Sequence, residues 1–215
     1  MDARDRTRNP KGTPTKASRW PRTDRRALRI QATLQRRQPD LTVVLEDVHD
    51  PHNVSAVLRS CDAVGVLDVH LVYVREELPR RAFARSTSGS AAKWLRFFTY
   101  TAIDDCYATL RRQRFSILAS ALGRERISHF EKDLTQPVAL VFGNEQRGVS
   151  PEALAGADET FVIPMMGMVQ SLNISVACAV TLFEAMRQRS VVGGYESQRL
   201  EDSVLEAIAA EWLVK

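Results

Sequence analysis

The sequence predicts an α/β protein with a mostly parallel sheet covered by helices on both faces. Three observations support this fold class. Short apolar or β-branched runs such as LTVVLEDV (41–48), DVHLVYV (68–74) and PVALVFG (137–143) have the length and composition of buried strands. Helical segments of about ten or more residues separate them, which is typical of parallel sheets buried on both sides. The 215 residues, 44% of them hydrophobic, suit one domain with a sizeable core.

The remaining elements continue a β-α-β rhythm along the chain. Helices are predicted over 52–65, where Gly65 ends the first of them, over 102–113 and over 172–189, and further strands over 96–100, 114–122 and 160–164. Four regions result: a basic extension expected to be disordered (1–21), a basic helix with Ala27, Ile30 and Leu34 on its apolar stripe (22–40), a main domain (41–192), and a C-terminal loop with an amphipathic helix (193–215).

Charge is distributed unevenly along the chain. Residues 1–40 contain 12 Lys/Arg and 4 Asp/Glu, which leaves 18 basic and 22 acidic residues for the remainder. A basic arm on a mildly acidic body is typical of nucleic-acid binding, because Lys and Arg that neutralise phosphates release condensed counterions. A solubilising tail or a contact with an anionic membrane surface is the alternative.

Cysteine spacing and hydropathy exclude several classes of protein. Cys61, Cys106 and Cys178 are odd in number and widely spaced in apolar segments, so we predict buried thiols and neither a disulfide framework nor a metal site. No apolar run is long enough for a membrane span, and the N-terminus lacks the apolar centre of a secretory signal. We expect a cytoplasmic protein without membrane contact.

Unusual polar residues follow three of the predicted strands. The carboxyl ends of parallel strands are where such folds bind ligands. Asn144 and Glu145 stand between two glycines in GNEQRG, Gly167 bends the methionine-rich PMMGMVQSLN, and Asn53 is expected to cap a helix that presents Arg59 about one and a half turns later. Each feature alone is also compatible with an ordinary loop, a simple helix cap, a solvated charge or packing. Together they indicate an apolar cleft for a flat heterocycle attached to a sugar.

Three segments, in this order, resemble the motifs of a known enzyme family. NVSAVLRSCDAVGV (53–66), ALVFGNEQRGVSPEAL (139–154) and VIPMMGMVQSLNISVACAVTLFEAMRQR (162–189) are similar to motifs one, two and three of the SPOUT methyltransferases of the SpoU branch. The resemblance extends from about Asp24 to the C-terminus. It implies the SPOUT fold, whose C-terminal segment forms a deep trefoil knot, a rare exception to the general absence of knots.

By this resemblance the C-terminal segment binds S-adenosylmethionine. Ile163, Met165 and Leu172 are expected to enclose the adenine, and Gly143 is expected to let the chain pass close. The complete expected cofactor site consists of Ser120, Ala121, Leu122, Gly143, Asn144, Gly148, Ile163, Met165, Gly167, Ser171, Leu172 and Asn173.

The resemblance also implies a catalytic set, a reaction and a homodimer. Arg59 matches the family's catalytic arginine, and Asn53, Glu145, Ser171 and Asn173 match its polar motif residues. The implied reaction transfers the cofactor's methyl group to the ribose 2'-hydroxyl of guanosine 18 in the D-loop of tRNA. Residues from both chains of a dimer packed through the helix 173–189 are expected to contribute.

Binding of tRNA is expected to involve several basic positions, each of which is alternatively a solvated surface charge. They are Arg25, Arg26, Arg29, Arg36, Arg37, Lys93, Arg187 and Arg189. Trp94 beside Lys93 is interpreted as a core residue, with stacking on a base as the alternative.

Two other functions remain compatible with the sequence. One is a ribosomal RNA 2'-O-methyltransferase of the same branch, for example of the antibiotic-resistance type, and the other is an RNA-binding protein that has lost catalysis on this fold. The short single-domain form favours tRNA, and the presence of Arg59, Glu145 and Asn173 favours activity. Residues 1–21 depart from the family pattern, and they either add tRNA affinity or are dispensable.

Overall fold

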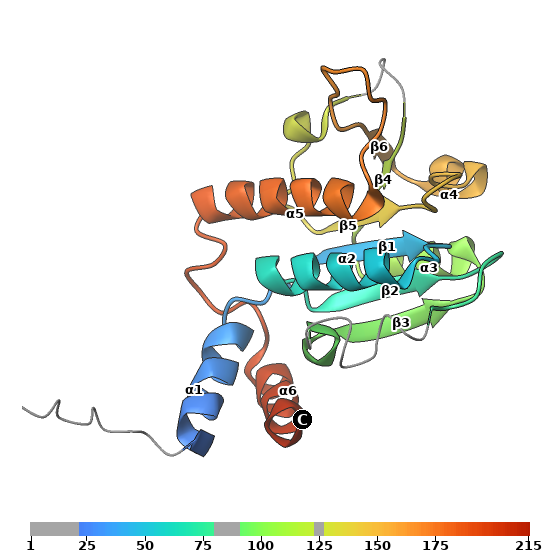
Figure 1. The fold of residues 1–215 in the computed structure, drawn as a ribbon. Coiled ribbons are helices and arrows are strands. Elements are labelled where there is room, and N and C mark those ends of the chain that lie inside the picture. The colour runs from blue at the N-terminus through green and yellow to red at the C-terminus, as the bar shows by residue number, and fades with distance from the viewer. Residues whose placement is uncertain (1–21, 80–90, 123–126) are drawn as a thin grey trace, which may run out of the picture.

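The computed structural model describes residues 22–79, 91–122 and 127–215, so the predicted extension 1–21 lies outside the described residues. Six strands form one sheet in the order β3-β2-β1-β5-β4-β6, and every strand pair is parallel (Figure 1). The strands are β1 (Leu41–Glu46), β2 (Asp68–Val72), β3 (Arg96–Tyr100), β4 (Ser116–Ser120), β5 (Val138–Phe142) and β6 (Glu159–Phe161). The predicted α/β class with a parallel sheet is confirmed.

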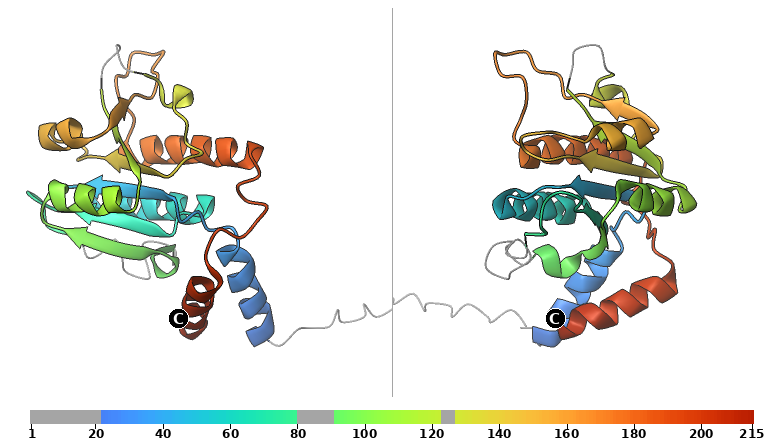
Figure 2. Two further views of the ribbon diagram at one scale, coloured as in Figure 1. Left: turned by 180° about the vertical axis from the view of Figure 1, so that it is seen from behind. Right: turned by 90° about the vertical axis from the view of Figure 1, so that its right-hand side faces the viewer.

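Helices cover both faces of this sheet (Figure 2). Helices α2 (Pro51–Val64) and α5 (Ile174–Val191) cover one face, and α3 (Ile103–Arg112) and α4 (Pro151–Gly156) cover the other. Because side chains alternate along a strand, β1 feeds both cores. Val43 and Leu45 pack in the core under α2 and α5, whereas Val44 packs under α3 and α4. All six residues of β1 are buried, as expected for a central parallel strand.

A third cluster joins the two ends of the chain. Helix α1 (Arg22–Leu34) lies against α6 (Asp202–Val214), beside the sheet at the amino ends of its strands (Figure 1). Ile30 and Leu34 are buried against Ile208 and Trp212, which confirms the predicted apolar stripe of the first helix. Gly65 ends α2 as predicted, with φ of +89° and a position where a Cβ would lie 2.7 Å from the Arg36 carbonyl oxygen.

Two of the arginines predicted to bind RNA are buried structural residues instead. Arg37 is fully buried, with Nη2 2.5 Å from Asp62 Oδ1 and Nη1 2.6 Å from the Val66 carbonyl oxygen. Arg189 is also fully buried, and its Nη1 lies 2.5 Å from Asp40 Oδ1. The prediction is wrong for both residues, because each guanidinium is enclosed by carboxylate and carbonyl acceptors and cannot reach a phosphate.

The three cysteines are free and buried, as predicted. Burial raises the pKa of the Cys106 thiol to about 12. Across the described ranges, no helix combines the length and the apolar character that crossing a membrane requires, and no three His, Cys, Asp or Glu side chains are grouped as metal ligands.

His70 of β2 makes the stability of the fold sensitive to acid. Its side chain is buried, and its ring stacks on Phe98 and on Tyr100, whose hydroxyl oxygen lies 3.0 Å from His70 Nδ1. Burial lowers the pKa of His70 to about 4. The unfolded chain binds the proton near pH 6.5 and the folded chain does not, so we expect the free energy of unfolding to fall by about 3 kcal/mol from pH 6.5 to pH 4.

Urea unfolding of the native protein and of His70→Gln at pH 7.5, 6.5, 5.5 and 5.0 tests this. Glutamine keeps a polar group near Tyr100 but does not titrate, so the variant should lose stability less steeply below pH 6.5. Burial also lowers the pKa of His129, so part of the slope should remain. His52→Gln, at an exposed position, should keep the native slope. A slope unchanged in His70→Gln would assign the acid sensitivity to other groups.

Candidate functional site

A cavity of about 400 Å³ opens at the carboxyl ends of β4, β5 and β6. Its walls come from the segments that follow these strands, at 120–122, 142–149 and 163–172, and from the first turns of α5. The connections that follow β1 and β5 lead to opposite sides of the sheet, so a switch point lies between these two strands. Parallel sheets bind ligands at such a switch point. The volume is within the range of small-molecule sites.

Most of the residues expected in the cofactor site surround this cavity. Gly167 and Asn173 do not line it, and Gly167 lies in the exposed loop before α5. The residues that do are Ser120, Ala121, Leu122, Gly143, Asn144, Gly148, Ile163, Met165, Ser171 and Leu172.

The loop after β5 is held in shape by its own backbone and by Asn144. Asn144 Oδ1 accepts hydrogen bonds from the backbone N–H groups of Gln146 (2.9 Å) and Arg147 (3.2 Å). Its Nδ2 donates to the Asp47 carbonyl oxygen at 2.8 Å, which joins this loop to the one after β1. A Cβ on Gly143 would lie 2.1 Å from the Gly148 carbonyl oxygen. The backbone that passes close to Gly143 is therefore that of Gly148, in the same loop after β5.

A hydrogen-bonded network connects the three sequence motifs beside the cavity. Asn53 Nδ2 donates to Glu145 Oε1 at 3.1 Å, and Asn173 Nδ2 donates to Asn53 Oδ1 at 3.0 Å. Asn173 Oδ1 also accepts from the Ser175 backbone N–H at 2.8 Å and so caps α5. The structure thus brings together three of the five predicted catalytic residues, which come from α2, the β5–α4 loop and the start of α5.

Two residues that the sequence reasoning missed also hold Glu145. His49 Nδ1 lies 3.1 Å from Glu145 Oε2, and the Asp50 backbone N–H donates to Glu145 Oε1 at 3.2 Å. Partial burial acts to raise the pKa of Glu145. Hydrogen bonds from Asn53 and from backbone N–H groups, with the influence of His49, outweigh this effect and hold the pKa below its ordinary value. Glu145 is therefore a carboxylate at neutral pH.

Asn53 does not cap α2 as predicted. The cap is Asp50, whose Oδ1 accepts from the His52 backbone N–H at 2.8 Å, and Pro51 occupies the first helical position. Asn53 lies in the first turn, where its side chain is free to join Glu145 and Asn173. The prediction failed because both Asp50 and Asn53 are good caps, and the Asp-Pro pair is the stronger signal.

The other two predicted catalytic residues are placed differently. Ser171 is exposed and lines the cavity. Arg59 is exposed on α2 and does not line it. Six residues after Asn53, it lies about 9 Å further along the helix axis and on another side of the helix. The single chain therefore does not bring Arg59 to the cavity.

Apolar side chains remain exposed on α5 and on the segment before it. Val176, Val180 and Phe183 are 46%, 36% and 47% exposed, and their spacing places them on one face of α5. Met166 and Met168 are more than 90% exposed. Exposed apolar surface of this extent is characteristic of an interaction site.

The predicted RNA-binding positions other than Arg37 and Arg189 remain accessible. Lys93 is partly buried in the 3₁₀ helix η2 (Ala91–Trp94). Arg187 is exposed and paired with Glu184, with an Nη2–Oε1 distance of 2.8 Å. The exposed arginines of the N-terminal segment are Arg25, Arg26, Arg29 and Arg36.

The fold and the cavity define an α/β protein that binds a small molecule at the carboxyl ends of a parallel sheet, beside a carboxylate–amide network. The chain belongs to the SpoU rRNA methylase family, whose family model matches residues 40–183. It is 47% identical over 194 residues to a tRNA (guanosine(18)-2'-O)-methyltransferase of Thermus thermophilus, in an alignment that covers 90% of this chain and 98% of the relative. The resemblance to the SpoU branch is thereby confirmed.

Two solved structures are similar over most of the chain. The A. aeolicus TrmH/SpoU tRNA modifying enzyme has a TM-score of 0.81 and 35% identity, covering 89% of this chain and 96% of that one. An AdoMet-bound rRNA methyltransferase from Sinorhizobium meliloti has a TM-score of 0.60 and 26% identity, covering 73% of this chain and 59% of that one.

Proposed function

We propose that this protein is an S-adenosylmethionine-dependent tRNA methyltransferase that methylates the ribose 2'-hydroxyl of guanosine 18 in the D-loop. The observation that carries the proposal is the network of Glu145, Asn53 and Asn173 beside the cavity. The name of the Thermus relative, which aligns over nearly its whole length, supports the choice of tRNA and of guanosine 18 over ribosomal RNA. We place the reaction in the cytoplasm, with the tRNA substrate.

The residues around the cavity fit S-adenosylmethionine. Ile163, Met165 and Leu172 supply apolar walls for the adenine, and the segment 120–122 supplies backbone groups on the other side. Glu145, ionised at the rim, has the charge that suits a cationic sulfonium. When bound, S-adenosylmethionine supplies an electrophilic methyl group. The similar methyltransferase solved with AdoMet supports this assignment.

Arg59 positions the nucleophile in this proposal. A guanidinium keeps its proton near neutrality and is therefore a poor base. We assign it to the ribose hydroxyl and the adjacent RNA phosphate, which its planar fork holds together. When the hydroxyl oxygen takes the methyl group, the methyl–sulfur bond of the cofactor would break and the thioether would be the leaving group. The hydroxyl proton would pass to the phosphate or to a transiently neutral Arg59.

Completion of the site needs a second chain and a knotted C-terminal segment in this proposal. Arg59 is outside the cavity of its own chain, and the face of α5 with Val176, Val180 and Phe183 is exposed. Pairing of two copies through this face buries it and brings Arg59 of one protomer to the cavity of its partner. The trefoil knot, in the segment that ends in α5, is what the resemblance of the three motifs to the SPOUT methyltransferases implies.

The test is incubation of the full chain with methyl-labelled S-adenosylmethionine and an unmodified tRNA transcript, followed by nuclease mapping of the label. We expect label on the 2'-oxygen of guanosine 18. A transcript with 2'-deoxyguanosine at position 18 is the matched control and should remain unlabelled. Label on a base, or on a ribosomal RNA transcript but not on tRNA, would overturn the proposal.

Gly143→Ala should abolish cofactor binding, whereas Gly148→Ala should only weaken it. An alanine Cβ at position 143 meets backbone atoms of Gly148 at 2.1 Å, so the loop that walls the cavity must open. At Gly148 a Cβ meets nothing within 4 Å, and only the φ of +69° is unfavourable, which costs about 1–2 kcal/mol. Calorimetric titration with S-adenosylmethionine should show no measurable binding to Gly143→Ala and weakened binding to Gly148→Ala. Native affinity in Gly143→Ala would contradict this account of the loop.

A further inference from the structure

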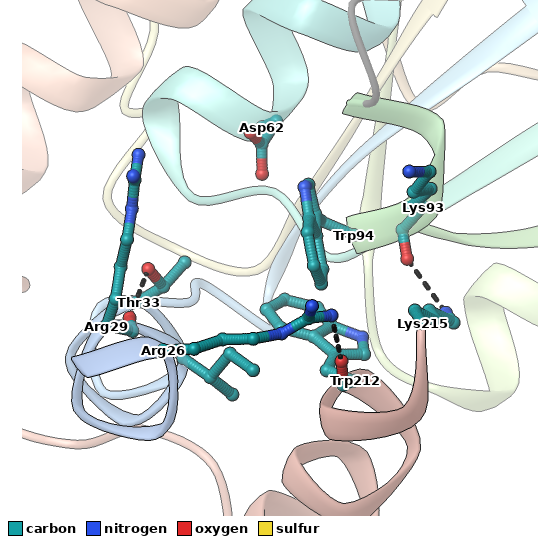
Figure 3. A pocket seen from close by; sticks show the side chains of 9 residues that line it. Arg26, Arg29, Thr33, Asp62, Lys93, Trp94, Trp212 and Lys215 are labelled. Atoms are coloured by element: carbon teal, nitrogen blue, oxygen red, sulfur yellow. Dashed lines mark hydrogen bonds between the residues drawn. The ribbon is translucent and has the colours of Figure 1, made fainter. Parts of the chain in front are cut away.

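A second cavity, of about 390 Å³, lies at the other end of the sheet from the methyl-transfer site. Figure 3 shows this cavity from close by. It is formed where α1, α6, η2 and the end of α2 meet, near the amino ends of β2 and β3. We name it the terminal groove, and its lining residues are Arg26, Arg29, Ile30, Thr33, Asp62, Lys93, Trp94, Trp212 and Lys215. Nothing in the proposed reaction uses it.

Positive charge dominates the terminal groove. Arg26 and Arg29 enter from α1, and Lys93 and Lys215 lie on the opposite side, beyond Trp94 (Figure 3). Within the described part of the chain, the side chains of Arg29 and Lys93 form no ion pair. Lys215 donates to the Lys93 carbonyl oxygen at 2.8 Å and pairs with Glu211.

The one acidic side chain among the lining residues does not cancel this charge. Asp62 Oδ1 is 2.5 Å from Nη2 of the buried Arg37. The same guanidinium donates to the Trp94 carbonyl oxygen at 3.0 Å. Arg37 therefore neutralises Asp62 and also fixes η2 and α2 against the end of α1, so the floor of the groove is rigid and the field above it is positive.

Two indole rings form the wall between the two pairs of cations. The rings of Trp94 and Trp212 meet edge to face, with centroids 5.1 Å apart. Trp212 is 2% exposed and is covered by the Arg37 guanidinium at 5.2 Å, so its ring is a core element. Trp94 is only partly buried and lines the groove. An aromatic ring flanked by unpaired cations is how proteins hold an unstacked base and its phosphates.

We propose that the terminal groove binds an unpaired nucleotide of the RNA substrate, with the base against Trp94 and the neighbouring phosphates at Arg29 and Lys93. Its volume suits one nucleotide better than a helical peptide. The strands between the two sites of one chain have five residues, about 17 Å, so a nucleotide in the terminal groove is not the one methylated at the cavity of the same chain. The inference rests on the proposed function only in taking RNA as the partner.

Equilibrium binding of a tRNA transcript to the full chain at 50–200 mM KCl tests the proposal. Arg29→Gln with Lys93→Gln should weaken binding about tenfold or more at 100 mM and lower the salt slope by roughly 1–2, because phosphate contacts are lost. Trp94→Leu should weaken binding about five- to tenfold with the native salt slope, and Trp94→Phe should restore most of the loss. Arg112→Gln, which removes one exposed positive charge on α3, is the control for loss of a surface charge outside the groove and should bind as the native protein does.

Native affinity and salt slope in the Arg29→Gln, Lys93→Gln variant would overturn the proposal, as would an equal loss in Arg112→Gln. Competition by free GMP at the affinity of the transcript would also overturn it, because the groove would then serve a free nucleotide. The affinity for S-adenosylmethionine, measured in parallel, reports whether each variant is folded. A native protein that binds tRNA through these residues but never labels it would refute the proposed function and leave this inference standing.

Discussion

Replacing Arg59 with alanine is expected to lower kcat for tRNA methylation by about 1,000-fold, while the free energy of unfolding changes by no more than about 0.5 kcal/mol. The two effects separate because Arg59 is exposed and does not line the cavity at the carboxyl ends of β4, β5 and β6 of its own chain. In the proposed function Arg59 only holds the ribose hydroxyl and a phosphate in the substrate complex. Such positioning contributes mainly to kcat. Single-turnover methylation with saturating S-adenosylmethionine measures the first quantity, and urea unfolding measures the second.

Arg59→Lys separates charge from geometry. Lysine keeps the positive charge but loses the planar fork that engages two acceptors at once. We expect tRNA affinity near the native value and kcat between those of the native protein and Arg59→Ala. Native turnover in Arg59→Lys would show that the planar guanidinium fork has no role in catalysis. Arg112→Ala is the control for loss of a surface arginine.

Mixed dimers of Arg59→Ala with Gly143→Ala test whether Arg59 acts on the partner's cavity. If it does, each heterodimer has one cavity with intact Gly143 that faces an intact Arg59 of the partner subunit. Random mixing makes half of the dimers heterodimers, so about a quarter of the native activity should return. If Arg59 serves its own chain, every site in the mixture carries one defect and activity stays at the level of the separate variants.

The sheet was predictable because its central strands carry a strong local signal. Leu41–Glu46 and Val138–Phe142 are buried at every position, and such short continuous apolar runs are read as parallel strands from sequence alone. The boundaries were less accurate. The last helix of the main domain was predicted to begin at Leu172, whereas Asn173 caps α5 at Ile174.

The burial of Arg37 and Arg189 could not be predicted in this way. Periodicity assigns an arginine at a helix end to the solvent, and whether it is enclosed depends on acceptors distant in sequence. Asp62 is 25 residues from Arg37, and Asp40 is 149 residues from Arg189. His49 was missed for a similar reason, because its contact with Glu145 spans 96 residues.

Replacing Arg189 with methionine should have the largest effect on stability. The side chain is fully buried and makes five hydrogen bonds. Its acceptors include the carbonyl oxygens of Leu134, Asp40 and Gln136, so it fixes α5 to the segments that lead into β1 and β5. Breaking a buried network of this kind costs about 3–5 kcal/mol. Urea unfolding at pH 7.5 measures the loss, and Arg112→Met, at an exposed position on α3, should shift the midpoint little.

A second substitution, at Asp40, tests whether the loss of stability in Arg189→Met comes from the Asp40 carboxylate or from the carbonyl oxygens. Asp40 keeps an ion pair with Arg199 at 2.6 Å after Arg189 is lost, so its carboxylate is not stranded. The Asp40 carbonyl oxygen also keeps its hydrogen bond from the Val138 backbone N–H at 2.9 Å. Among the described residues, the carbonyl oxygens of Leu134 and Gln136 have no such substitute, and an unpaired buried acceptor costs about 1–3 kcal/mol. Asp40→Asn should therefore not rescue Arg189→Met. Rescue would assign the cost to the carboxylate instead. Native stability in Arg189→Met, together with weaker tRNA binding, would show instead that Arg189 binds RNA and is not a structural residue.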